Sequence, residues 1–225
     1  MKYAVSSPNI YKELKQKIKE LGYEFIPSFY DTNLPLYLRY HADLTLTKLD
    51  DKTAVSSPIA YDYYAKKLKG VKIIKGISDN RDYYPNDTIY NAAVFKNFII
   101  HNLEISDKSL LEQNKNFINV KQGYTKCNIL IAKDKIITGD KGIYNALKNE
   151  DLETILIDDK SIELQGYSRG FIGGATGSHK NYIFVNGDLK NLPNLKMELN
   201  KICKALIDVK DELIRDIGSI LLFEI

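Results

Sequence analysis

The side chains most able to act as nucleophiles, general bases or metal ligands are few in this sequence. Its 225 residues include two cysteines, Cys127 and Cys203, and three histidines, His41, His101 and His179. The histidines lie far apart without the spacing of zinc ligands, and two cysteines cannot supply a disulfide framework or a thiolate cage. We therefore expect neither a metal nor another cofactor.

His41 has a carboxylate two residues away, at Asp43. The segment His41–Thr47 alternates apolar and polar residues, which is typical of a half-buried strand. Residues two apart on a strand share a face, so His41 and Asp43 can form an acid–base pair or bind a cation together. The alternative is an exposed histidine at the rim of a strand. His101 is expected in a loop, and His179 on the surface of a hairpin turn.

Cys127 opens an apolar run and directly follows Lys126. A neighbouring ammonium group lowers the pKa of a thiol and favours a reactive thiolate. Consecutive side chains of a strand point to opposite faces, however, so Lys126 and Cys127 are not expected to point inward together. The alternative for Cys127 is a small core residue. Cys203 lies on the apolar stripe of the last predicted helix and is expected in the core.

The elements that must position these residues follow from a repeat. Ala-Val-Ser-Ser-Pro occurs at residues 4–8 and 54–58, each time before a helical pattern. Around the second copy, Ser57 and Pro58 have the residue types that begin helices. The pattern there predicts a unit of strand, turn, strand, helix and strand, at 41–47, 48–52, 53–55, 58–69 and 71–74.

The same order of elements recurs along the chain. Three further units are predicted to begin at Thr88, at Cys127 and near Gly173, with helices capped by Ser106, Asp140 and about Asn191. A fifth unit is divided between the two ends, with a helix after Ser7 and Pro8. We predict that residues 218–224 pair antiparallel with residues 2–6, so that the termini are neighbours. Chance similarity within an irregular α+β domain is the alternative.

Composition limits the classes of function. The chain is 44% hydrophobic and 27% charged with a formal charge of +3, which is too balanced for a nucleic-acid-binding surface. No apolar run reaches the roughly 18 residues of a membrane span, and the first residues do not form a signal peptide. We expect one cytoplasmic domain over residues 1–225, with no membrane partner; composition leaves the oligomeric state open.

Five strand–strand–helix–strand units, closed by pairing of the two ends, resemble the pentein fold. This α/β propeller is the fold of guanidino-group-modifying enzymes, such as arginine deiminases and amidinotransferases, and of a non-enzymatic ribosomal anti-association factor. The resemblance implies a central channel lined by the beginnings of the first strands, and suggests an uncharacterised bacterial member. The channel residues expected to bind a ligand are Asp43, Asp87, Asn91, Asn128, Thr176 and Ser219.

Enzymes of this family attack an amidino carbon with a cysteine of the terminal strand, assisted by a histidine, while carboxylates hold the guanidinium. This sequence has no cysteine after Cys203, and Gly218 or Ser219 takes the place of the nucleophile. Unit order places the family histidine near residues 122–127, where none occurs. By the same order, Asp43 matches a carboxylate that binds substrate.

Three functions therefore remain open. The first is a polar cleft that binds a small cationic or polar ligand of guanidino type without the family's Cys–His pair. The second is a divergent amidinohydrolase or deiminase in which Cys127 and His41 are catalytic. The third is a non-catalytic interaction module, by analogy with the anti-association factor.

Overall fold

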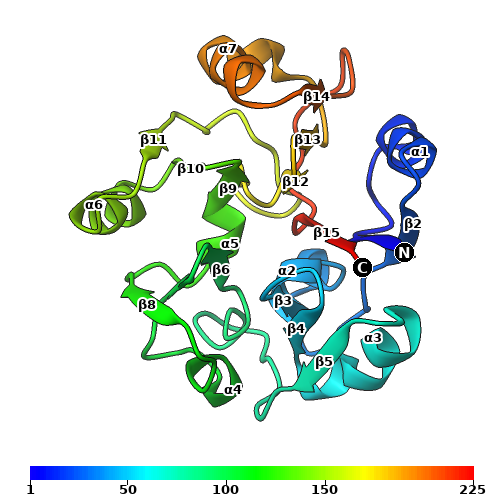
Figure 1. The fold of residues 1–225 in the computed structure, drawn as a ribbon, viewed down its shortest axis with the longest axis vertical. Coiled ribbons are helices and arrows are strands. Elements are labelled where there is room, and N and C mark those ends of the chain that lie inside the picture. The colour runs from blue at the N-terminus through cyan, green and yellow to red at the C-terminus, as the bar shows by residue number, and fades with distance from the viewer.

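The β structure consists of five separate three-stranded sheets in the computed structural model, which describes residues 1–225 (Figure 1). The fold is therefore mixed α/β, with several small sheets in place of one large sheet. In each sheet one pair of strands is antiparallel and the other is parallel. The antiparallel pair is the predicted strand–turn–strand hairpin, and the parallel pair is joined by the predicted helix.

Four units are continuous in the chain and share this order of elements. The first two are β3 (Leu46–Lys48), β4 (Thr53–Ser56), α3 (Tyr61–Lys67) and β5 (Lys72–Lys75), then β6 (Ala93–Phe95), β7 (Phe98–His101), α4 (Lys108–Leu111) and β8 (Asn116–Asn119). The next two are β9 (Ile129–Ala132), β10 (Lys135–Thr138), α6 (Lys141–Asn149) and β11 (Thr154–Leu156), then β12 (Thr176–His179), β13 (Tyr182–Val185), α7 (Pro193–Ile202) and β14 (Ala205–Ile207).

The two ends of the chain share the fifth sheet. Its strands are β15 (Ile220–Glu224), β1 (Lys2–Ser6) and β2 (Glu24–Pro27), and α1 (Lys12–Glu20) connects the last two. The predicted antiparallel pairing is present, with Lys2 opposite Glu224, and the Met1 ammonium donates to the carbonyl of Ile225 at 2.6 Å. Figure 1 shows both termini at this sheet.

The five sheets lie around a common centre (Figure 1). The strands β3, β6, β9, β12 and β15 lie nearest this centre, and α1, α3, α4, α6 and α7 lie at the periphery. Apolar stripes hold the helices in place: Leu14 and Ile18 of α1 are buried, as are Ile143 and Leu147 of α6. None of the helices combines the length and apolarity needed to cross a bilayer.

The inner strands begin later than the alternating pattern predicts. The residues expected to open two of them instead form the helical turns α2 (Ala42–Thr45) and α5 (Thr125–Asn128). A single helical turn spans too few residues for its periodicity to be distinguished from that of a strand. The prediction of a strand over 41–47 is therefore wrong for residues 41–45 and right for residues 46–47.

The predicted helix starts are right in one unit and wrong in others. Asp140 caps α6, accepting a hydrogen bond from the Ile143 backbone at 2.8 Å. Helix α4 is capped by Asp107 instead of Ser106, because the Asp107 carboxylate accepts from the backbone of Ser109 at 2.9 Å.

The two Ser-Pro pairs do not cap their α-helices. Ser57 precedes a 3₁₀ turn, Pro58–Ala60, and makes no capping bond, whereas α1 begins only at Lys12 after Tyr11. The last helix does begin at Pro193, with Leu192 instead of Asn191 at its cap position. The Ser-Pro pairs thus indicate where the chain turns, but they do not predict which side chain accepts the capping hydrogen bond.

Candidate functional site

Segments from different units meet at the centre through a set of buried polar side chains, here called the central cluster. Its members are supplied by α2 and the residue before it, by the segment before β6, by α5, and by the segment before β15. They are His41, Asp43, Asn91, Lys126, Cys127, Asp216 and Ser219. The sequence predicts five of these seven as site residues, all except Lys126 and Asp216.

Cys127 lies inside this cluster. Its thiol donates to Asp43 Oδ2 at 3.2 Å and accepts from the amide of Asn91 at 3.3 Å, and its backbone donates to Asn91 Oδ1 at 3.1 Å. Only 2% of Cys127 is exposed. Burial and the nearby Asp43 carboxylate raise the pKa of the Cys127 thiol well above its usual value, so the group is held as a thiol.

Asp43 is the acceptor at the middle of the cluster. Its Oδ2 accepts from the Cys127 thiol and from the hydroxyl of Ser219, the latter at 2.5 Å. Its other oxygen, Oδ1, is buried and has no hydrogen-bond partner. Its backbone donates to the carbonyl of Gly218 at 3.2 Å, which ties α2 to the segment before β15.

Lys126 and Cys127 both point inward, so the prediction that only one of them can do so is wrong. The Lys126 ammonium donates to Ser219 Oγ at 3.0 Å, while the Cys127 thiol contacts Asp43. The reason is the helical turn α5, in which successive side chains are separated by about 100° instead of the 180° of a strand. Burial lowers the pKa of Lys126, against the opposing effect of Asp43 and Asp216.

His41 and Asp216 form the other side of the cluster. His41 Nδ1 lies 4.0 Å from Asp216 Oδ1, and both side chains are buried. Burial lowers the pKa of His41 to about 4, and burial together with Asp43 raises the pKa of Asp216 to about 7. The expectation of an exposed rim histidine is therefore wrong. Asp216 was missed because it precedes the predicted strand start, although it lies only two residues before Gly218.

A tight backbone turn places Gly218 against His41. Gly218 and Ser219 both have positive φ, at 74° and 68°, and a Cβ on Gly218 would lie 2.3 Å from the Cα of His41. Only glycine tolerates so close an approach at this conformation. The two carboxylate oxygens of Asp216 stabilise the turn by accepting hydrogen bonds from the backbone N–H groups of Gly218 and Phe171, at 3.0 Å each.

The other three predicted ligand residues lie outside this hydrogen-bonded cluster. Asp87 accepts from the hydroxyl of Tyr124, and its Oδ1 is buried without a partner. Asn128 donates to the carbonyl of Tyr124 at 2.8 Å, within its own helical turn. Thr176 donates to the carbonyl of Ile172 at 2.7 Å. In Asn128 and Thr176, the side chains serve the local backbone.

The two remaining histidines are more buried than the sequence suggests. His101 is fully buried at the end of β7, between Ser106 Oγ at 2.7 Å and the carbonyl of Gly123 at 3.1 Å. His179 ends β12 and contacts the hydroxyl of Tyr23 at 2.8 Å. The loop and surface predictions for them are wrong, because neighbouring units cover both strand ends. Cys203 is half-buried against the core around α7, close to expectation.

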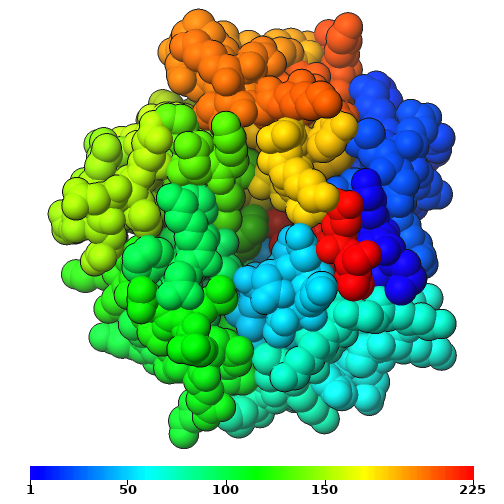
Figure 2. All heavy atoms as spheres, viewed as in Figure 1, coloured from blue at the N-terminus to red at the C-terminus, as the bar shows by residue number.

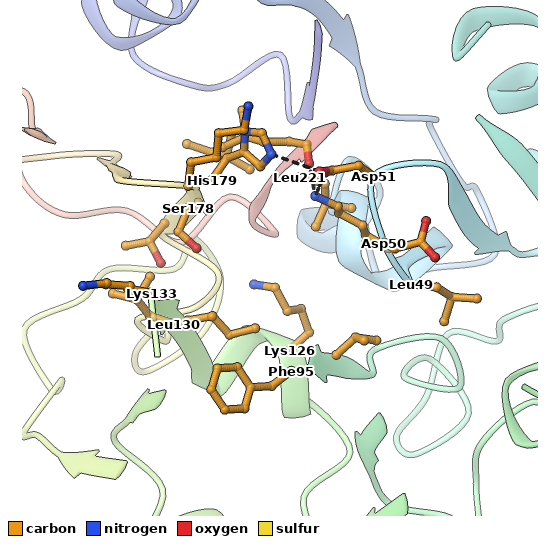
Figure 3. A pocket seen from close by; sticks show the side chains of 18 of the residues that line it. Leu49, Asp50, Asp51, Phe95, Lys126, Leu130, Lys133, Ser178, His179 and Leu221 are labelled. Atoms are coloured by element: carbon orange, nitrogen blue, oxygen red, sulfur yellow. Dashed lines mark hydrogen bonds and ion pairs between the residues drawn. The ribbon is translucent and has the colours of Figure 1, made fainter. Parts of the chain in front are cut away.

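Two depressions approach the central cluster. One, here called the hairpin funnel, has a volume of about 650 Å³ and opens among the hairpin turns, with Lys126 in its lining. Figure 2 shows it as the hollow at the middle of the face, and Figure 3 shows Lys126 extending into it from α5. His179 and Thr176 also line this funnel.

The other depression, here called the tyrosine cleft, has a volume of about 1090 Å³. Its lining includes His41 and Asp216, so the central cluster lies between this cleft and the hairpin funnel. Aromatic side chains make up much of the remaining wall. They are Tyr30, Tyr37, Tyr40 and Tyr167.

Comparison with known proteins adds a family but no activity. No curated protein matches the chain. A family model described as a family of unknown function, DUF6873, matches residues 5–221 and so covers nearly all of the strands and helices described above, including every member of the central cluster. The chain belongs to this family, DUF6873.

Proposed function

We propose that this protein is a five-unit α/β propeller of pentein type whose tyrosine cleft binds a small cationic ligand of guanidino class. The repeated three-stranded sheets, the shared terminal sheet and the inner position of the first strands support the fold. The observation that carries the function is the composition of the cleft, whose lining includes Asp216 and His41 together with four tyrosines.

These residue types suit a planar cation. Aromatic faces attract cations within about 6 Å of the ring centroid, and a carboxylate oxygen can accept a further hydrogen bond from a guanidinium. The cleft volume of about 1090 Å³ is at the upper end of the range of small-molecule pockets. Gly218 or Ser219 takes the place of the terminal-strand cysteine of the guanidino-modifying enzymes, and the Ser219 hydroxyl donates to Asp43, so binding is better supported than catalysis.

Thermal unfolding in the presence of arginine, agmatine and citrulline tests this proposal. A ligand present at about 100 times its Kd stabilises the folded state by about 2.7 kcal/mol, which raises the Tm measurably. The cations arginine or agmatine should raise the Tm, and the neutral citrulline should raise it less. No shift with any of the three would reject the proposed function.

A matched pair of tyrosine variants locates the binding site. Tyr37 lines the cleft and is 46% exposed, whereas Tyr83 lies outside it and is 49% exposed. Tyr37→Ala should reduce the ligand-induced Tm shift, and Tyr83→Ala should leave it unchanged. Equal shifts in the two variants would place the ligand elsewhere. Asp216 is a poor choice for this test, since both of its oxygens accept backbone hydrogen bonds.

A second candidate, a deiminase or amidinohydrolase using Cys127 and His41, is favoured by one observation. The Cys127 sulfur, an Asp43 oxygen and a His41 ring nitrogen lie within 4.8 Å of one another. Release of ammonia, the deiminase product, or of urea, the amidinohydrolase product, from arginine or agmatine should then be lost in Cys127→Ala and kept in Cys203→Ala. The burial of the thiol, which a substrate would have to reach past His41, makes this the weaker candidate.

A further inference from the structure

Three buried side chains of types that bind transition metals converge in the central cluster. His41, Asp43 and Cys127 each present one ligand atom, and these atoms all lie within 4.8 Å of one another. Cys127 is separated from Asp43 by 84 residues, so the three side chains do not form a short sequence motif from which a metal site could be predicted. We propose that His41, Asp43 and Cys127 form a binding site for a thiophilic divalent metal ion such as Zn²⁺.

The carboxylate of Asp43 has an oxygen free for such an ion. Oδ2 already accepts from the Cys127 thiol and from Ser219, but Oδ1 is buried with no partner. Asp43 as a whole is 1% exposed, so solvent does not satisfy this atom. An unpaired buried carboxylate oxygen is costly, and a bound metal ion is one of the partners that can satisfy it.

The charges of the cluster accommodate a divalent ion. Acidic groups outnumber basic ones here, since Asp43, Asp216 and the Cys127 thiol all lie close to the one ammonium group of Lys126. On metal binding, the Cys127 sulfur bonds to the metal and its proton leaves to solvent. The Asp43 carboxylate and the Cys127 thiolate then supply two negative charges next to the divalent ion.

Neighbouring residues hold each ligand in place, as is usual around metal sites. The Asn91 amide donates to the Cys127 sulfur at 3.3 Å and to the Asp43 carbonyl at 3.1 Å. Asp216 Oδ1 lies 4.0 Å from His41 Nδ1, and Gly218 packs against the His41 backbone. The site is therefore largely preformed.

The donor set indicates the kind of metal. One thiolate, one imidazole and one carboxylate suit zinc and cobalt better than magnesium or calcium, which prefer oxygen ligands. Three protein ligands leave the fourth tetrahedral position free. His41 lines the tyrosine cleft, which offers the ion a route from solvent. This proposal does not depend on the guanidino ligand proposed above.

Cobalt titration of the full chain tests the site. Co²⁺ bound by a thiolate gives a sulfur-to-cobalt charge-transfer band in the near ultraviolet, which should saturate at one equivalent and disappear on adding Zn²⁺. The band should persist in Cys203→Ser and be lost in Cys127→Ser. Absence of the band in the wild-type protein, or its persistence in Cys127→Ser, would overturn the proposal. Mg²⁺ added in excess should not reduce the band.

A second measurement keeps the test decisive if Cys127→Ser does not fold. In the zinc-loaded Cys203→Ser protein, Cys127 is the sole thiol, and X-ray absorption at the zinc edge should show one sulfur at about 2.3 Å. A spectrum with nitrogen and oxygen ligands only would rule the site out. Asp43→Asn, which keeps the size of the side chain, should weaken Co²⁺ binding by at least about tenfold.

Discussion

At the scale of single residues, burial sets the protonation of the groups that could do chemistry. Cys127 is kept as a thiol by burial and by the Asp43 carboxylate, whereas burial keeps His41 and His101 neutral, with pKa values of about 4. A buried charge is tolerated only beside a partner, and Lys126 has Asp43 and Asp216 nearby. The cluster is therefore buried and hydrogen-bonded, with a protonated thiol at Cys127 and a neutral imidazole at His41.

His101 should make folding stability depend on pH. Its folded pKa of about 4 lies below the ordinary value of 6.5, so on acidification the unfolded chain takes up the proton first. Stability should therefore fall between pH 6.5 and about pH 4, by up to about 3 kcal/mol from this group. The groups that face it are Ser106 and the backbone of Gly123 and Thr88, none of them charged.

The comparison of wild type with His101→Gln isolates this contribution, because His41 is present in both proteins. Urea unfolding at a series of pH values should show a shallower loss of stability for His101→Gln. Parallel curves for the two proteins would contradict the assignment.

At the scale of elements, the same short sequence signal has different outcomes in different units. Asp140 caps α6 by accepting a hydrogen bond from the Ile143 backbone. Ser57 is equally typical of a helix start, but it makes no capping bond, and its hydroxyl is buried and unpaired. The difference arises because the chain after Ser57 first forms a 3₁₀ turn, which moves the start of α3 to Tyr61.

Alanine at these two positions should therefore have opposite effects. Asp140→Ala removes a working cap and should lower the free energy of unfolding by about 1 kcal/mol. Ser57→Ala removes only an unsatisfied buried hydroxyl and should leave stability unchanged or slightly higher. The midpoints of urea unfolding measure both. Equal losses in the two variants would show that Ser57 does support its helix.

At the scale of the whole molecule, the shared sheet of β15, β1 and β2 joins the two ends of the chain. Leu221 and Phe223 of β15 lie in the same apolar cluster as Tyr3 and Val5 of β1, so the last strand is part of the core. The Met1 ammonium lies 2.6 Å from the Ile225 carbonyl, so the two ends are close enough to be joined.

A circular permutant tests this property. We expect a chain with joined ends, reopened in the exposed turn between Lys96 and Asn97, to retain cooperative unfolding. Reopening within the buried strand β4, between Val55 and Ser56, should abolish it, because core and sheet bonds are broken there. Circular dichroism during urea titration distinguishes the two. Failure of the first permutant to fold would mean that the terminal pairing depends on chain order.

The sequence by itself determined the order of the units and the pairing of the ends. Strand alternation and helical stripes are local patterns that can be read from the sequence. Because the units repeat, the order of elements in one unit predicts the order in the others. The incomplete units at the two ends therefore predict that residues 2–6 pair with residues 218–224. Five of the seven central residues were also predicted, because they precede the inner strands.

Only the tertiary structure decided which side chains of these segments meet, and in what state. The turns α2 and α5 are a single helical turn each, too short to show a period, so the inward direction of both Lys126 and Cys127 could not be derived from spacing. The inclusion of Asp216, the burial of His101 and the grouping of His41 with Asp43 and Cys127 depend on contacts between different units. Such contacts arise from the packing of the sheets around their centre, which no local pattern encodes.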